Sequence, residues 1–476
     1  MKKTKSLIAL IFAYLVTSVS VFAQYDISFE IKNCKEDTLL LGYYYLDGTF
    51  AIDTATNDKG KFRFKDKKRT LEKGLYFITN NKGRNCEFLI SGEQDLKFKT
   101  LDSSWPDNLE CTNSKNEQTY IEYLKKSNAL GKEFHELTRQ KNILDTKTYS
   151  DKLHQLSSEN DKLKEDFIRE NPNHLLSKIL SAAKPVSVPE FQTIYKADGT
   201  IDSVEMRHRG YYWYKNHYFD NIDLNENGLL RTPKAVFYSN FMNYWENVLK
   251  YEKADSVLHY ADYWINKAQD KKMYNFMVYE ITKHYLQDNI MGHDKIYVGM
   301  VENYFKSGKY DGLSVSDMEM NIKRADTWSN LLIGKTIPNL ACVQDDSNSV
   351  WHHLDEIKAK YKVLIFWSVE CSHCTIEIPQ IAEKYDENKQ KYNMEIFSVH
   401  TEGEVDEMKK FLQEKNIHWI NTNGLYANYN WREYFDIEKT PVIYILDSNN
   451  KILAKNLSAN NLWQVLDILE NGGFEL

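Results

Sequence analysis

The chain has 476 residues, more than one ordinary domain contains, and this length predicts two to four domains. Its content of 42% hydrophobic and 13% aromatic residues argues against disorder, and its six cysteines are too few for a small disulfide scaffold. A formal net charge of −7 disfavours binding to the phosphate backbone of a nucleic acid.

Residues 1–23 have the pattern of a secretory signal peptide. Three lysines among the first five residues precede an apolar run over residues 7–16, and the segment ends at Ala23, a small residue of the type found at cleavage sites. No cysteine stands directly after Ala23, which argues against a lipoprotein, and no later apolar run is long enough to span a membrane. We therefore expect an exported, periplasmic protein without stable membrane insertion after cleavage. The alternative is an uncleaved N-terminal anchor.

Residues 24–110 are predicted to form a small, β-sandwich-like antiparallel domain. Ile27, Phe29 and Ile31 alternate with polar residues, as in a half-buried strand, and further short apolar runs such as residues 75–78 are separated by turn residues. The segment contains no acid pair, metal-ligand cluster or phosphate loop from which a role is readable.

Residues 111–330 change to helical spacing and are predicted to form a central all-α domain. Aromatic and apolar residues between Phe237 and Leu249 fall on one wide helical face, which we interpret as core packing rather than as a binding groove. The stretch from Lys125 to Arg169 is rich in charge with spaced apolar residues, which is typical of an exposed helical hairpin.

A loop at residues 223–228, Asp-Leu-Asn-Glu-Asn-Gly, matches the first six positions of an EF-hand calcium loop. The twelfth position requires a bidentate Glu, but it is Lys234, a cation. The sequence therefore favours a plain turn here, and we predict no metal site.

Residues 331–476 alternate between strand and helix patterns. This order predicts an α/β domain around a mixed sheet. The expected strands are residues 362–367, 395–399, 442–446 and 452–453, and the expected helices are residues 372–389, 405–414 and 460–470.

A Cys-Ser-His-Cys sequence stands where the first of these strands meets a helix. Cys371 at the helix start lies near unpaired backbone N–H groups, which favour its thiolate, and Cys374 one turn later is close enough to form a disulfide with it. A Cys-x-x-Cys pair closing such a unit predicts a redox pair. The alternatives are a zinc site, which needs two further ligands, and two inert thiols.

The segment around this pair resembles the thioredoxin-fold, TlpA/ResA-like thiol–disulfide oxidoreductases of the bacterial envelope. The likeness rests on Phe-Trp-Ser at residues 366–368, Cys-x-x-Glu-x-Pro at residues 374–379 and Thr-Pro at residues 440–441. The whole chain also resembles multidomain exported proteins of Bacteroidota, in which a β domain and a helical domain precede a thioredoxin-like domain.

This resemblance implies roles for five residues. Cys371 would be the attacking thiol and Cys374 the resolving thiol, with the disulfide between them as the only redox group and no separate cofactor. Glu377 would handle protons near the buried thiol. Thr440 and Pro441, at the position of the family's cis-proline, would border the substrate. The implied partners are client proteins with thiols or disulfides and a membrane electron donor or acceptor.

The sequence departs from the family at Glu370, where Trp is usual. A carboxylate there should raise the pKa of the Cys371 thiol, whereas a cationic His373 would lower it, so these two residues tune the redox pair in opposite directions. The residues alone leave the redox direction open, and the family resemblance favours a reductant.

Two alternative functions differ from this one in what they require of the sequence. A peroxiredoxin would require Pro at position 364, where this chain has Leu. An exported binding or scaffold protein with unimportant thiols is the alternative outside enzymes. The sequence does not assign the pairing of the four remaining cysteines, the client, the roles of the first two domains or the oligomeric state; the remaining cysteines are Cys34, Cys86, Cys111 and Cys342.

Overall fold

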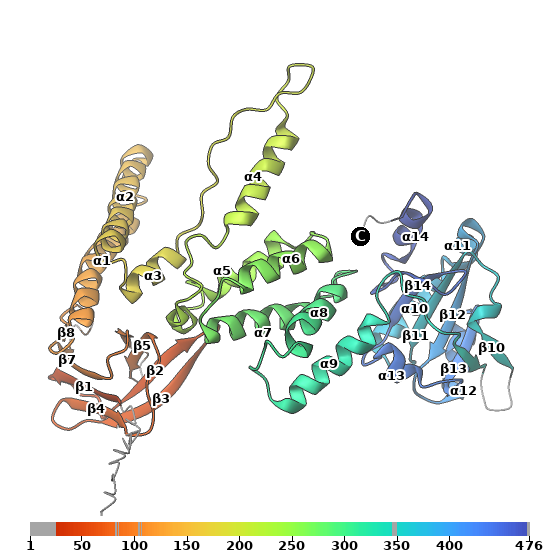
Figure 1. Ribbon diagram of the computed structural model, residues 1–476, viewed down its shortest axis with the longest axis horizontal. Coiled ribbons are helices and arrows are strands. Elements are labelled where there is room, and N and C mark those ends of the chain that lie inside the picture. The colour runs from red at the N-terminus through yellow and green to blue at the C-terminus, as the bar shows by residue number, and fades with distance from the viewer. Residues whose placement is uncertain are drawn as a thin grey trace, which may run out of the picture. The chain divides into compact units, whose positions relative to one another are not determined.

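The computed structural model describes residues 25–80, 83, 85–102, 105, 107–344 and 350–473 (Figure 1). The predicted signal peptide at residues 1–23 lies outside these ranges. The chain divides into two compact units, of which the first ends at Tyr244 and the second begins at Trp245. No helix in the described ranges is long and apolar enough to cross a membrane.

The first unit begins with two four-stranded sheets. Phe29 and Phe98 of one sheet stack with ring centroids 4.6 Å apart, and Phe88 of the other sheet lies 5.2 Å from Phe98. These rings fill the space between the sheets, as predicted for a β-sandwich, although β1 and β7 pair in parallel. The sheet orders are β4-β1-β7-β8 and β3-β2-β5-β6, with β1 (Tyr25–Lys32), β2 (Thr38–Tyr45), β3 (Gly48–Thr56), β4 (Lys61–Asp66), β5 (Gly74–Thr79), β6 (Asn85–Ile90), β7 (Asp95–Leu101) and β8 (Glu110–Cys111).

Helices complete the first unit, and the predicted helical hairpin is confirmed. The side chain of Ser114 caps the first helix of the hairpin by accepting from the Glu117 N–H group, and Asp145 caps the second in the same way. In the predicted turn, Asp223 forms an ion pair with Lys178 at 3.0 Å. The helices are α1 (Lys115–Arg139), α2 (Thr146–Glu170), α3 (Leu175–Ala182), α4 (Ser203–His217), η2 (Asn227–Arg231) and α5 (Tyr238–Asn243).

The helical part of the second unit packs around buried aromatic side chains. Trp264, Tyr285 and Tyr297 are almost completely buried, and so are Phe237, Phe241 and Trp245 of the stripe that was predicted to be core. The helices predicted as one central domain thus belong to both compact units. Those near or in the second unit are η3 (Tyr244–Val248), α6 (Ala254–Ile265), α7 (Lys271–Gln287), α8 (Asp294–Met300), η4 (Val301–Lys306) and α9 (Val315–Ser329).

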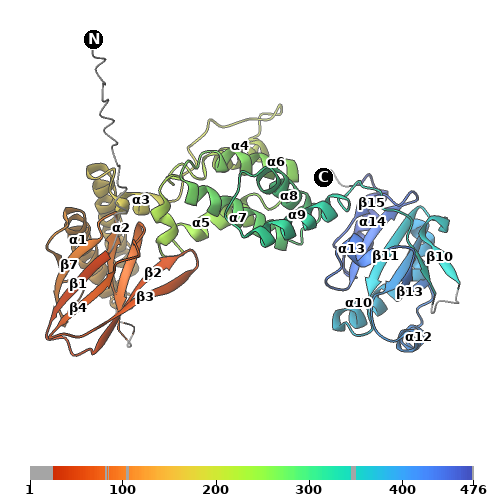
Figure 2. The ribbon, with the colours of Figure 1, turned by 60° about the horizontal axis from the view of Figure 1, so that its bottom comes forward.

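The C-terminal part of the second unit is a seven-stranded mixed sheet, seen with its flanking helices in Figure 2. All residues of its central strand β11 are buried, because helices or loops cover both faces. The strand order is β10-β9-β13-β12-β11-β14-β15. The strands are β9 (Ala341–Val343), β10 (Trp351–His353), β11 (Tyr361–Trp367), β12 (Met394–His400), β13 (Ile420–Ala427), β14 (Val442–Asp447) and β15 (Ile452–Ala454).

Two hydrophobic clusters attach the helices to this sheet. One cluster contains Val363 and Ile365 with residues of α10, α11, α12 and α14, and the other contains Leu364 and Phe366 with residues of α13. The helices therefore lie on both faces, which confirms the predicted α/β domain. Their bounds are η5 (Leu354–Glu356), α10 (Ser372–Ala382), α11 (Tyr385–Tyr392), α12 (Val405–Glu414), α13 (Trp431–Phe435) and α14 (Leu462–Glu470).

Candidate active site

Cys371 and Cys374 stand at the junction between β11 and α10. Cys371 is the N-cap residue of α10, and its sulfur accepts a hydrogen bond from the Cys374 N–H group at 3.4 Å. Cys374 lies in the first turn of the helix, and its side chain enters the hydrophobic cluster beneath it. The sequence pattern therefore places one thiol at the helix start and the other inside the core.

The two thiols have opposite acidities. Burial alone would raise the pKa of Cys371, but hydrogen bonds from the Cys374 and Thr440 side chains and from backbone N–H groups lower it below its ordinary value. Cys374 is fully buried, and this burial, together with the neighbouring Cys371, raises its pKa to about 12. Of the two thiols, the more accessible Cys371 is therefore the first to lose its proton as the pH rises.

Thr440 and Pro441 lie beside the two cysteines, and the peptide bond between them is cis. The Cys371 thiol donates to the Thr440 carbonyl oxygen at 3.1 Å. Hydrogen bonding by the Thr440 side chain lowers the pKa of both cysteines. The fold thus brings together four of the predicted site residues, although the two cysteines are 66 to 70 positions away from Thr440 and Pro441 in the sequence.

The remaining predicted site residues lie around this centre in different settings. The Glu377 carboxylate accepts a hydrogen bond from the Ala459 N–H group at 2.9 Å. His373 is exposed on the first turn of α10. Glu370 is also exposed, and its carboxylate lies beside Gly403. Their roles in proton transfer and redox tuning stay predictions.

His400 is a residue of this region that the sequence reasoning missed. It ends β12, is buried, and its Nε2 accepts a hydrogen bond from the Val369 N–H group at 3.3 Å, two residues before Cys371. Burial lowers the pKa of His400 to about 4, so the ring is neutral at pH 7. In the β11–β12 register His400 lies opposite Trp367, a pairing that no local sequence pattern indicates.

Ser368 fixes the loop before Cys371 from the other side. Its hydroxyl accepts from the Glu370 N–H group at 3.0 Å and donates to the Glu402 carbonyl oxygen at 3.1 Å. Together with the hydrogen bond to His400, these bonds satisfy the backbone N–H groups of Val369 and Glu370 in the loop before Cys371. The loop is therefore held by the side chain of Ser368, directly after β11, and by that of His400, at the end of β12.

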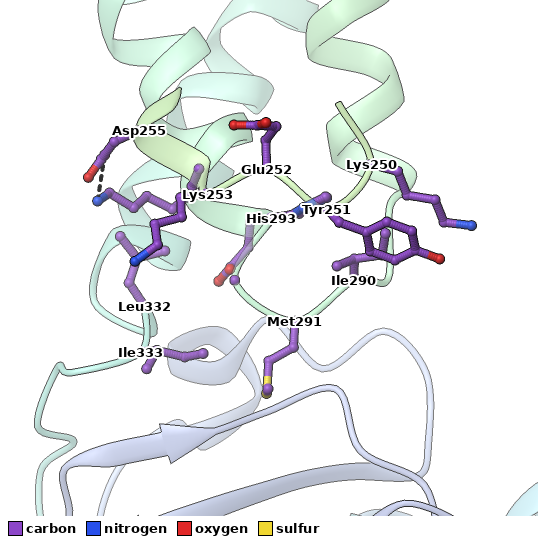
Figure 3. A pocket seen from close by; sticks show the side chains of 14 residues that line it. Lys250, Tyr251, Glu252, Lys253, Asp255, Ile290, Met291, His293, Leu332 and Ile333 are labelled. Atoms are coloured by element: carbon purple, nitrogen blue, oxygen red, sulfur yellow. Dashed lines mark ion pairs between the residues drawn. The ribbon is translucent and has the colours of Figure 1, made fainter. Parts of the chain in front are cut away.

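A separate cavity of about 390 Å³ lies in the helical part of the second unit (Figure 3). Ile290, Met291 and Ile333 line it together with several charged side chains. Two of these, Lys295 and Asp255, form an ion pair 2.6 Å apart, and the dashed line in Figure 3 marks an ion pair of the labelled Asp255. Neither Cys371 nor Cys374 lines this cavity.

The four other cysteines are free thiols in this structure. Burial raises the pKa of Cys342, on β9, to about 12, and burial also raises the pKa of Cys34 and Cys111. Raised pKa values suppress the thiolate, so the pair at the start of α10 differs chemically from these cysteines. Among the described residues, no three His, Cys, Asp or Glu side chains are placed to hold a metal ion.

Comparison with known families places this site in a recognised domain. Residues 359–452 match the family model described as thioredoxin-like, and this segment includes both cysteines and Thr440. None of the curated proteins matches the chain.

Solved structures from bacteria are similar to parts of the chain. A domain of a possible thiol-disulfide isomerase from Cytophaga hutchinsonii is 32% identical over 29% of this chain and 94% of its own, with a TM-score of 0.27. A thioredoxin-like protein from Bacteroides caccae is 17% identical over 60% of this chain and 99% of its own, with a TM-score of 0.48. The thioredoxin domain of a thiol-disulfide oxidoreductase from Bacteroides vulgatus is 24% identical over 29% of this chain and 96% of its own, with a TM-score of 0.26.

The family match and the α/β fold cover the same part of the chain. The sheet, the helix that begins after Cys371 and the Thr440–Pro441 segment all fall in or next to residues 359–452. The chain therefore carries a C-terminal thioredoxin-like domain, preceded by a β domain and a helical region.

Proposed function

We propose that this protein is a thiol–disulfide oxidoreductase of the cell envelope that reduces disulfides in client proteins through Cys371 and Cys374. The observation that carries the proposal is the asymmetry of the pair. Cys371 is partly exposed and has a lowered pKa, whereas Cys374 is buried and has a raised pKa. Such a pair supplies an accessible nucleophile and a protected second thiol, which disulfide exchange needs.

The reaction would proceed in two exchanges. The Cys371 thiolate attacks one sulfur of a client disulfide, forming a mixed disulfide and releasing the other client sulfur as a thiolate, which takes up a proton. Cys374 then gives up its proton and attacks the Cys371 sulfur, releasing the second client thiolate. The client gains two electrons and two protons, and Cys371 and Cys374 become a disulfide.

Cys374 must lose its proton at the second exchange although burial holds its pKa at about 12. Glu377, one turn further along α10, is the carboxylate that the family resemblance assigns to this proton. In the reduced structure its Oε2 is bonded to the Ala459 N–H group. We propose that this acid accepts the proton by way of water when the mixed disulfide has formed.

The reducing direction is supported by the resemblance of the segment around Cys371 to the TlpA/ResA-like oxidoreductases. Strong oxidants owe their high reduction potential to a reduced form that is stabilised as a thiolate. Here His373, the residue that resembles an oxidising member, is exposed, so solvent screens its effect on the Cys371 sulfur. We expect a reduction potential nearer to about −270 mV, as in thioredoxin, than to about −120 mV, as in a strong oxidant.

The envelope location is supported by the signal-peptide pattern of residues 1–23. Structural disulfides persist in such compartments, so client disulfides are available there. Each reduction leaves the protein oxidised, and a membrane electron donor would have to restore the dithiol.

Reduction of insulin disulfides by the full chain tests the proposal. We expect Cys371→Ser to abolish the reaction and Cys374→Ser to accumulate a mixed disulfide between Cys371 and insulin, visible on a non-reducing gel. Cys342→Ala is the matched control, because this thiol is buried on β9 and should leave the rate unchanged. Equal rates for Cys371→Ser and the unsubstituted chain would instead favour the scaffold alternative.

A further inference from the structure

Helix α9 contacts the segment that leads to the Thr440–Pro441 bond. The guanidinium group of Arg324 pairs with Asp436, with Nε 3.1 Å from Oδ2, and also with the Glu438 carboxylate. The indole Nε1 of Trp328 donates to the same Asp436 Oδ2 at 2.8 Å. Two side chains, one turn apart on α9, therefore hold one carboxylate.

The contacted acids lie close to the redox centre along the chain. Asp436 ends α13 in the left-handed conformation, with φ of 50°, so the chain turns sharply there. Glu438 is two residues before Thr440. After Pro441 the chain enters β14, which pairs with β11. The loop from Asp436 to Pro441 is thus anchored by the sheet at one end and by α9 at the other.

Thr440 connects this loop to the thiols, so the position of the loop determines which hydrogen bonds the thiols make. Its carbonyl oxygen accepts from the Cys371 thiol at 3.1 Å, and its side chain hydrogen bonds with the cysteine pair. A hydrogen bond weakens steeply beyond its normal length, so a small displacement of Thr440 would remove these contacts.

The ion pairs of Arg324 with Asp436 and Glu438 are suited to fixing the position of the loop. The side chains of Arg324 and Asp436 are only 25% and 24% exposed, and the guanidinium fork engages two carboxylates at once. On the same helix, Lys323 pairs with Glu433 at 2.9 Å, but these side chains are 73% and 60% exposed. An exposed Lys–Glu pair contributes little and orients its partner weakly.

Helix α9 is itself held against the thioredoxin-like domain at a second place. Lys455, at the end of β15, bonds Asp294 at 2.8 Å and the Leu331 carbonyl oxygen at 3.0 Å, and both charged side chains are 7% exposed. Leu331 follows α9 by two residues. The helix is therefore fixed near its C-terminal end, so Arg324 projects from a helix that is itself held in place.

We propose that α9 holds the Thr440–Pro441 loop against Cys371, with Arg324 as the positioning residue. This inference rests on the proposed function, and it gives the helical region a part in the chemistry of the thioredoxin-like domain. Loss of the Arg324 contacts would let the loop move away from the sulfur, and the Cys371 thiolate would lose the hydrogen bond of the Thr440 side chain that stabilises it.

The test compares Arg324→Ala with Lys323→Ala in the full chain. The readout is the rate of Cys371 alkylation by iodoacetamide at a series of pH values, followed by mass spectrometry of the Cys371 peptide. We expect Arg324→Ala to raise the midpoint of the pH profile and to slow alkylation at pH 7 at least threefold, and Arg324→Lys to recover part of this loss. Lys323→Ala should stay within twofold of the unsubstituted chain.

An unchanged pH profile in a folded Arg324→Ala protein, judged by its circular dichroism, would overturn the inference. If Arg324→Ala does not fold, Trp328→Phe and Glu438→Gln, which each remove one contact, decide by the same criteria. Alkylation requires no client, so its outcome is separate from the proposed function. Absence of insulin reduction by the unsubstituted chain would overturn only the proposed function.

Discussion

The Thr440 carbonyl oxygen accepts the hydrogen bond of the Cys371 thiol at 3.1 Å, across 69 positions of sequence. This contact joins the start of α10 to the loop before β14, and it brings a second Thr440 group, the side-chain hydroxyl, to the same sulfur. The acidity of the attacking thiol therefore depends on a loop as well as on the helix that it caps.

Replacement of Thr440 tests this dependence directly. In Thr440→Ala the carbonyl contact stays but the hydroxyl is lost, so the pKa of Cys371 should rise toward its ordinary value. A rise of one unit reduces the thiolate at neutral pH by about tenfold. We expect alkylation of Cys371 at pH 7 to slow several-fold in Thr440→Ala and to recover in Thr440→Ser. Equal rates in the alanine variant would show that the hydroxyl does not contribute.

The pH dependence of Cys371 alkylation should show the lowered pKa of this thiol. The thiolate is the reactive form, so the rate rises about tenfold per pH unit below the pKa and levels off above it. The midpoint in the folded protein should be below that of the same peptide in the urea-unfolded chain. Cys374 and Cys342, each with a pKa of about 12, should stay unmodified near pH 9. A midpoint equal to the unfolded value would contradict the lowered pKa.

His400 should make the thioredoxin-like domain less stable in acid. Its pKa is about 4 in the folded protein and about 6.5 in an unfolded chain. Between these values the unfolded chain binds the additional proton, so stability falls as the pH decreases from 6.5 to 4, by up to about 3 kcal/mol. His400→Gln keeps an acceptor for the Val369 N–H group and removes the titration. Urea unfolding at several pH values should show a flatter profile in this variant.

The buried pair of Lys455 and Asp294 should carry more stability than an exposed pair of the same type. Lys455→Met leaves the Asp294 carboxylate buried without its cation, which costs about 3–5 kcal/mol. Lys360→Met is the control, since Lys360 pairs with Glu470 at 2.7 Å with half of its side chain exposed, and its loss should cost far less. Urea unfolding of both variants measures the difference. Similar costs would mean that burial adds nothing at this pair.

The sequence was informative where a local pattern determines the structure. The apolar run of β11 followed by a helix start predicted the setting of Cys371, and the strand and helix at residues 394–414 lie within one residue of their expected places. The helix expected over residues 372–389 is instead two helices, because the chain breaks at Glu383 and Lys384 between α10 and α11.

Other elements lacked a signal of this kind. Strand β13 reads Ile-Asn-Thr-Asn-Gly-Leu-Tyr-Ala, with polar residues and a glycine that strand propensity disfavours, and its pairing with β12 and β9 is what forms it. The contact of Arg324 with Asp436 joins residues more than 110 positions apart, and nothing local to either residue indicates it. His400 likewise acquires its environment only when β12 lies beside β11.

The full burial of Cys374 also bears on how long the protein survives among oxidants. Peroxide reacts with an exposed thiolate first, so damage would begin at Cys371 as a sulfenic acid. A protected thiol one helical turn away condenses with that group and yields a disulfide, which a reductant can reverse, before the irreversible sulfonic acid forms. The same buried sulfur that completes the exchange with a client thus preserves the attacking cysteine.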